Sequence, residues 1–155
     1  MRTDVLVAQV RAAFERVHRA VFLGDPVANA RLSVDVVDVD VVHDAPTLVL
    51  VLVTPWTVNG LIFTPDDAFP EALEIAGRRR PVFRVELTGL ATFRSVNLPV
   101  DTAALRSMAQ ARTLARSWVP PLHQAIRTAL AAPALGGRSG PPSPAGTPDE
   151  GPARC

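Results

Sequence analysis

Apolar residues near the start of the chain recur at intervals of three and four, the spacing of one face of an amphipathic helix. The residues on this face are Val7, Val10, Phe14, Val17 and Val21. Thr3 or Asp4 is suited to cap the start of this helix, and Gly24 and Pro26 to end it. His18 lies beside the apolar face; because no second ligand stands at helical spacing, we interpret it as a flanking residue.

A strand pattern follows over residues 32–42, where apolar and polar residues alternate. The alternation slips by one position at Val36 and Val37. Such a slip would turn the second half of the strand to the wrong face. We therefore expect a β-bulge at Val36–Val37.

The same segment and the turn after it carry an acidic cluster that raises the question of a metal site. Its members are Asp35, Asp38, Asp40, His43 and Asp44. On a regular strand Asp35 and Asp38 point to opposite faces, although the expected bulge could bring them together. We favour the interpretation that the cluster is a charged solvent face that discourages edge pairing, and we expect no metal.

The most apolar stretch runs from Leu48 to Val53, inside an expected strand over residues 47–53. A strand without alternation is covered on both faces, which predicts the central strand. Thr54 can cap a short helical turn with Pro55 in its first position, where no N–H is needed. We expect this turn to span residues 54–59, to reverse the chain at Gly60 and to return as a strand over 61–64.

The second half of the chain is expected to alternate between short elements. Residues 69–76 are predicted as a short helix, and the triplet Arg78–Arg80 as a solvated basic loop. Residues 82–88 and 91–98 have strand periodicity and are separated by Gly89.

After Pro99 the period becomes helical, and Asp101 or Thr102 is expected to cap this helix. The apolar positions are Leu105, Met108, Ala111, Ala115 and Trp118. Pro120–Pro121 interrupts the pattern, and residues 122–130 continue it as a second short helix. The predicted fold class is α+β, with an N-terminal helix, a mainly antiparallel sheet of about five strands and C-terminal helices packed on it.

The composition divides the chain near Pro133. Residues 133–155 contain six prolines and five glycines among 23 residues, with almost no large apolar side chains. Such a segment cannot bury enough surface to offset its ordering entropy. We expect one domain over residues 1–132 and a disordered tail over 133–155.

Charge and motifs exclude several classes of protein. The 16 basic residues, all arginine, nearly balance 15 acidic ones, which indicates no nucleic-acid or polybasic membrane surface. No apolar run approaches the ~18 residues that span a bilayer, and no export signal is visible, so we expect no membrane insertion and a cytoplasmic location. The only cysteine is Cys155. Phosphate-binding and nucleophile-elbow motifs are absent, so we predict neither an enzyme nor a cofactor.

The stretch LVTPWTVNGLIFTP, preceded by a VRAAFERVHRA helix, resembles the HybE (HupJ) family of NiFe-hydrogenase assembly chaperones. The matching residues are Thr54, Pro55, Trp56, Asn59 and Pro65. Pro81–Phe83 and the stretch 90–98 before a closing helix extend the resemblance to roughly residues 5–130. The family often has a Cys-Ser-Leu sequence where this chain reads Arg94–Leu98, so that cysteine is missing here. Some relatives carry a fused rubredoxin, whose paired cysteines this chain lacks.

The resemblance implies a cytoplasmic maturation factor that binds an immature hydrogenase subunit. The implied partner is the small-subunit precursor with its twin-arginine signal, with the large subunit and other maturation factors as further candidates. By the same resemblance Thr54, Pro55, Trp56 and Asn59 would form the partner-binding site. Trp56 is either an anchor for the partner or a cap on the core. The alternative to a chaperone is a small intracellular adaptor or ligand-binding domain unrelated to hydrogenases.

Overall fold

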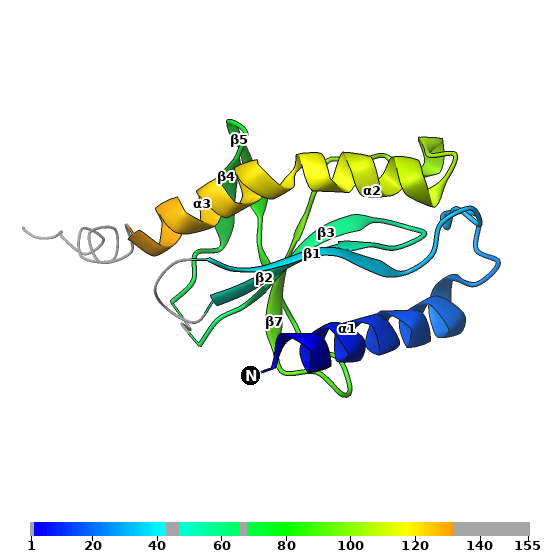
Figure 1. The fold of residues 1–155 in the computed structure, drawn as a ribbon, viewed down its shortest axis with the longest axis horizontal. Helices are drawn as coiled ribbons and strands as arrows, with labels where there is room; N and C mark the ends of the chain where they lie inside the picture. Colours follow the sequence, from blue (N-terminus) through cyan, green and yellow to red (C-terminus); the bar gives the residue numbers. More distant parts are fainter. Residues whose placement is uncertain (1, 43–46, 66–67, 132–155) are drawn as a thin grey trace, which may run out of the picture.

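The computed structural model describes residues 2–42, 47–65 and 68–131. Within these residues a five-stranded antiparallel sheet, in the order β1–β2–β3–β7–β6, lies between two helical layers (Figure 1). The elements in chain order are α1 (Thr3–Val17), the π-helical turn η1 (His18–Phe22), β1 (Asp35–Val42), β2 (Thr47–Val53), β3 (Val58–Phe63), β4 (Ala72–Ile75), β5 (Arg78–Pro81), β6 (Phe83–Val85), β7 (Phe93–Asn97), the 3-10 turn η2 (Thr102–Ala104), α2 (Met108–Ser117) and α3 (Val119–Ala131). The predicted α+β class is confirmed.

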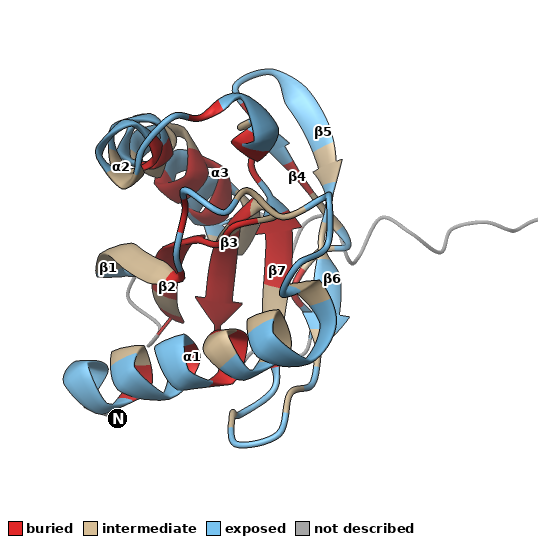
Figure 2. Ribbon diagram, turned by 90° about the vertical axis from the view of Figure 1, so that its right-hand side faces the viewer, coloured by how far each residue is buried: buried red, intermediate tan, exposed pale blue. Residues whose placement is uncertain are grey.

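Strand β2 supplies side chains to both halves of the core. Val49, Val51 and Val53 pack in the cluster on the side of α2 and α3. Leu50 and Leu52 pack with residues of α1 on the other face. The central strands are accordingly buried while the helices expose their outer sides (Figure 2). The uninterrupted apolar run of β2 therefore reflects burial on both faces, as predicted, although β3 is the middle strand of the sheet.

The predicted bulge in β1 is confirmed. The register with β2 runs from Asp35 opposite Val53 to Val36 opposite Leu52, and then shifts so that Asp38 pairs with Val51. Val37 is the extra residue. Because of the bulge, Val36 before the slip and Val39 after it both pack against the core on the α1 side of the sheet.

Helix α1 departs from its predicted face at both ends. Its buried residues are Leu6, Val10, Ala13 and Phe14. Val21 is 61% exposed, because the chain changes to a π-helical turn after Val17 and the period of the α-helix no longer applies. The N-cap position is Arg2, and neither Thr3 nor Asp4 caps the helix.

Gly60 lies inside β3 and does not form the turn, which closes earlier with Val53 opposite Val58. A Cβ atom at Gly60 would lie 2.7 Å from Leu122 Cδ2 of α3. Glycine is needed there because the strand and α3 approach each other closely.

The helix predicted over 69–76 is wrong, as is the basic loop at Arg78–Arg80. Strands β4 and β5 form a separate two-stranded hairpin that stands beside α3 (Figure 1). Ala76 and Gly77 join them with positive φ angles of 51° and 80°, the pattern of a type I′ turn. Leu73 and Ile75 are buried and alternate with exposed Glu74. This two-residue period is that of a strand with one buried face, not of a helix.

The C-terminal half otherwise follows the sequence pattern with shifted boundaries. Strand β7 matches the prediction, whereas β6 covers only three residues of the strand expected over 82–88. Asp101 caps the short turn η2, and α2 is capped by Ser107. The predicted division into two helices is confirmed, but the break lies at Trp118, and Pro120 and Pro121 lie in the first turn of α3. The proposed tail, 133–155, lies outside the described residues and stays a prediction.

Candidate partner-binding site

The turn between β2 and β3 is held by the side chain of Thr54. Its hydroxyl oxygen accepts hydrogen bonds from the Trp56 and Thr57 N–H groups, at 3.3 and 3.0 Å, and the hydroxyl donates to the Thr57 carbonyl at 2.9 Å. The Thr54 N–H donates to the same carbonyl, also at 2.9 Å. Thr54 is completely buried. It caps the turn as predicted, although the turn is not helical.

Trp56 is half-buried and lies against the π-helical turn. Its ring stacks on Phe22, with ring centroids 4.2 Å apart and planes 13° from parallel. The centroid of the His18 ring lies 5.8 Å from the centroid of the Trp56 ring. His18, the first residue of η1, is therefore a packing partner of the tryptophan, which its place beside the predicted apolar helix face did not reveal.

Asn29 fixes the loop that follows the π-helical turn to the Thr54–Thr57 turn. Its N–H donates to the Pro55 carbonyl at 2.7 Å. Its side-chain amide donates to the carbonyls of Thr102 and Leu105, both at 2.8 Å. Nothing in the sequence pattern marks Asn29, because Pro55, Thr102 and Leu105 are all distant from it in the chain.

Three large apolar side chains lie exposed between these two contact points. Val21, Leu23 and Val27 are 61%, 68% and 55% exposed. Val21 and Leu23 are the chain neighbours of Phe22, which stacks on Trp56, and Val27 lies two residues before Asn29, whose N–H binds the Pro55 carbonyl. We call Trp56 together with these three residues the Trp56 surface.

Asn59 belongs to the same end of the sheet, whereas Pro65 does not. The Thr57 hydroxyl donates to the Asn59 side-chain oxygen at 3.1 Å. Pro65 follows the other end of β3, where it lines an apolar cavity of about 300 Å³ with Val41 and Phe63. The structure thus brings together Thr54, Pro55, Trp56 and Asn59.

Comparison with known families decides what kind of protein carries this turn. Residues 5–138 match the family model described as "[NiFe]-hydrogenase assembly, chaperone, HybE". The chain belongs to the HybE family. It is therefore a hydrogenase assembly chaperone and not an enzyme. Neither a curated protein nor a solved structure matches it.

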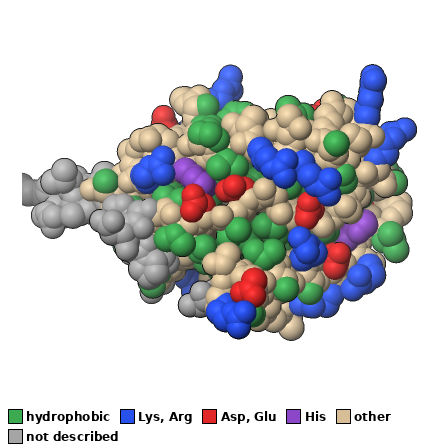
Figure 3. Space-filling view, viewed as in Figure 1, with side chains coloured by type: hydrophobic (Ala, Val, Ile, Leu, Met, Phe, Trp, Pro, Cys, Tyr) green, Lys and Arg blue, Asp and Glu red, His purple; other side chains and the backbone are tan. Residues whose placement is uncertain are grey.

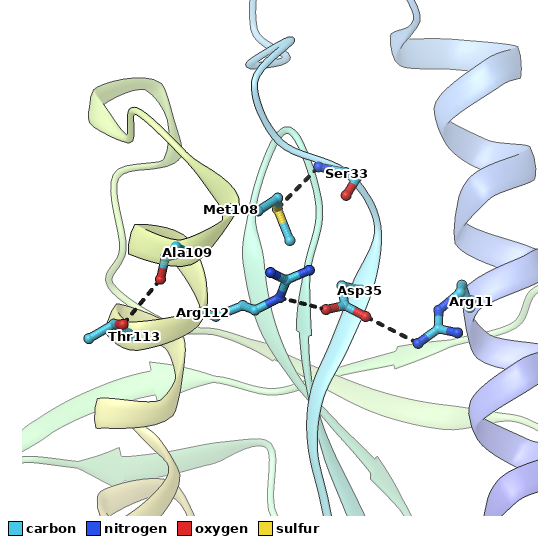
Figure 4. Close-up of polar contacts among 7 residues, drawn as sticks. All are labelled: Arg11, Ser33, Asp35, Met108, Ala109, Arg112 and Thr113. Carbon is cyan, nitrogen blue, oxygen red and sulfur yellow. Dashed lines mark hydrogen bonds and ion pairs between the residues drawn. The ribbon is translucent and has the colours of Figure 1, made fainter.

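In this HybE-family chain the acidic residues of β1 are divided among different partners. Asp35 binds Arg11 of α1 at 3.1 Å and Arg112 of α2 at 2.9 Å, so one carboxylate joins the two helical layers (Figure 4). On this face of the molecule acidic side chains lie beside arginine and histidine side chains (Figure 3). Within the described residues no three histidine, cysteine or acidic side chains are placed to hold a metal ion. His43 and Asp44 lie outside those residues.

Asp38 approaches His123 of α3, a histidine that the sequence pattern did not connect with β1. The distance from His123 Nε2 to Asp38 Oδ2 is 3.8 Å, too long for a hydrogen bond. Neither atom has a hydrogen-bond partner in the described part of the chain. Burial lowers the pKa of His123 below its ordinary value of 6.5, and the charges of Asp38 and Asp40 oppose this effect.

Two further expectations concern β7 and the helices. The stretch Arg94–Leu98, which lacks the cysteine expected from the family resemblance, forms most of β7, and Ser95 and Val96 are buried there. No helix in the described ranges is long and apolar enough to cross a membrane.

Proposed function

We propose that this HybE-family chaperone binds the small-subunit precursor of a [NiFe]-hydrogenase in the cytoplasm, while its twin-arginine signal is still attached and before export. The Trp56 surface, with Thr54, Pro55 and Asn59 as its support, is the contact that we assign to this partner. The observation that supports it is that Phe22, which stacks on the half-buried Trp56, has an exposed apolar residue on either side of it in the chain.

An export signal contains an apolar stretch that needs cover until the signal is used. An exposed apolar patch is a common mark of a protein-binding surface. The hydrogen bonds of Thr54 and the ring of Pro55 hold the turn in place, so Trp56 loses little conformational entropy when a partner binds. Tryptophan is also enriched among residues that dominate binding energy.

The experiment is capture of the small-subunit precursor by purified variants, with a denaturant melt of each variant. Trp56→Ala should weaken capture by at least ~2 kcal/mol, the scale of an interface hot spot. It should lower the free energy of unfolding by less than the ~3–5 kcal/mol of a core aromatic. Leu23→Ser should weaken capture with little change in stability, because the side chain is 68% exposed.

Val41→Ser is the matched control, because Val41 is 59% exposed but lies at the other end of the sheet. It should leave capture unchanged. If Trp56→Ala unfolds the protein, or if Leu23→Ser and Val41→Ser have the same effect on capture, the Trp56 surface is not the contact. Two further ligands are tested in the same assay. A small-subunit precursor that lacks its signal shows whether the signal is the part that is bound, and the large subunit shows which subunit is bound.

A further inference from the structure

The β4–β5 hairpin carries two arginines on the face that turns toward the core. The strand register places Arg78 opposite Ile75 and Arg80 opposite Leu73. Directly paired residues project to the same face of an antiparallel pair. Ile75 and Leu73 are only 1% and 2% exposed, so this face is the inner one. Arg79 lies on the outer face, opposite Glu74.

The two inward arginines line a cleft of about 380 Å³ between the hairpin and the junction of α2 with α3. The lining residues are Ile75, Ala76, Arg78, Arg80, Pro99 and Trp118. Arg79 is not among them. Apolar side chains and two cationic side chains thus share one recess.

The charges of this cleft have no counter-charge in the described part of the chain. The side chains of Arg78 and Arg80 form no ion pair or hydrogen bond there. By contrast, Arg11 and Arg112 both bind Asp35. Arg78 is exposed and Arg80 is half-buried, so an anion can reach both side chains from outside. Their planar donor groups match a carboxylate in two-point geometry.

We propose that this cleft binds an acidic segment of a protein partner. A carboxylate of the segment bonds to Arg78 and Arg80, and an adjacent apolar side chain packs on Trp118. A protein segment fits better than a phosphate group, because the start of α3 beside the cleft holds Pro120 and Pro121, which lack N–H donors. The cleft lies on the side of the sheet opposite α1 and requires a partner of opposite charge to a twin-arginine signal, so it is a second contact beyond the Trp56 surface.

The test is a titration of the full chain, labelled with ¹⁵N, with a blocked peptide Leu-Glu-Glu-Leu-Glu-Leu. The indole N–H signal of Trp118 and the Nε–H signals of the arginines report on binding. A peptide with glutamine at each glutamate position, and inorganic phosphate, are the ligand controls. We expect saturable shifts of Trp118 with the glutamate peptide only.

The variants separate the inner face from the outer face of β5. Arg78→Gln and Arg80→Gln should each raise the Kd about ten-fold, the effect of losing a charged hydrogen bond. Arg79→Gln makes the same change in charge on the outer face and should raise the Kd less than about two-fold. Arg78→Lys and Arg80→Lys keep the charge but lose the planar fork, and should fall between these values. They also serve in place of a glutamine variant that fails to fold in a thermal melt.

Several results would overturn the proposal. Equal weakening by Arg79→Gln would show diffuse attraction to a basic strand. Equal binding of the glutamine peptide would remove the role of the carboxylate. If phosphate shifts the same signals more strongly than the peptide does, the cleft is an anion site of another class. None of these results bears on capture of the precursor through the Trp56 surface.

Discussion

The two hairpins of this protein differ in what holds them. The β2–β3 hairpin is buried on both faces, and the hydroxyl of Thr54 closes its turn. The β4–β5 hairpin is anchored on one face by Leu73 and Ile75 and carries three consecutive arginines in its second strand. The first hairpin is part of the framework of the domain, whereas the second is an appendage that depends on α3.

This difference separates two kinds of surface. The turn of the β2–β3 hairpin is held by hydrogen bonds to the Thr54 hydroxyl, and it carries Trp56, the residue that we propose as the contact with the precursor. In the β4–β5 hairpin only the inner face is held, and the inner arginines have no carboxylate within the described ranges. The two proposed contacts, one with an apolar segment and one with an acidic segment, therefore lie on different hairpins and can be tested separately.

The largest expected effect tests which hairpin the domain needs. Val51→Asp should lower the free energy of unfolding by about 3–5 kcal/mol, because it leaves an unpaired charge at a fully buried position of β2. Arg79→Asp introduces the same carboxylate on the outer face of β5 and should cost less than about 1 kcal/mol. Urea denaturation of both variants measures the comparison. Similar costs would contradict the distinction between framework and appendage.

The next effect concerns the closure of the first turn. Thr54→Val should lower the free energy of unfolding by about 1–3 kcal/mol, because the N–H of Thr57 and the N–H of Trp56 lose their acceptor in a buried place. Thr54→Ser retains the hydroxyl and should recover most of this loss. Thermal melts of the two variants and the parent check the prediction. A serine variant as unstable as the valine variant would show that the methyl group matters more than the hydroxyl.

A smaller effect, of opposite sign, is expected in the second turn. Ala76 has φ 51°, a left-handed conformation that costs a residue with a Cβ atom about 1 kcal/mol. Ala76→Asn should therefore raise the free energy of unfolding by up to that amount, since asparagine suits the first position of a type I′ turn. Gly77→Ala should lower it, although nothing lies within 4 Å of the added Cβ atom. If neither change has an effect in denaturant melts, the hairpin opens before the domain unfolds.

The smallest effect is expected in α3, the helix on which both hairpins pack. Burial lowers the pKa of His123 in the folded state, against the opposing charges of Asp38 and Asp40. A histidine whose folded-state pKa is lowered contributes stability that is fully present above its unfolded pKa of 6.5 and is lost as pH falls toward the folded value. The free energy of unfolding should therefore decrease from pH 7.5 toward 5.5, and His123→Gln should reduce this slope. An unchanged slope would assign the pH dependence to other groups.

Patterns confined to one element predicted this fold well. The slip at Val36–Val37 predicts the bulge because strand periodicity is a local property. The apolar run of β2 predicts its burial on both faces. The pattern does not predict the hairpin over residues 72–81, because three consecutive arginines are typical of an exposed loop. Only the packing of Leu73 and Ile75 against the rest of the chain selects a strand. The place of Gly60 inside a strand is not predicted either, because the need for glycine there comes from Leu122, which lies far away in the sequence.

The candidate site shows the same limit. Thr54, Pro55 and Trp56 are contiguous, so their turn was visible in the sequence. Phe22 and Asn29, which hold the turn from outside, come from another part of the chain. No spacing rule connects residue 22 with residue 56, since the π-helical turn changes the direction in which Phe22 points.

The burial of β2 on both faces also has a consequence for biosynthesis. Helix α1 and the strands β1, β2 and β3 all precede residue 64. Together they supply most of the core on the α1 side of the sheet, and β6 and β7 supply the rest. The other half needs α2 and α3, which follow these elements in the chain and are translated after them. Until then Val49, Val51 and Val53 present a bare apolar face on the nascent chain. This hydrogenase assembly chaperone thus passes through a stage with an exposed apolar face of its own, and shortened chains that end before α3 are expected to aggregate.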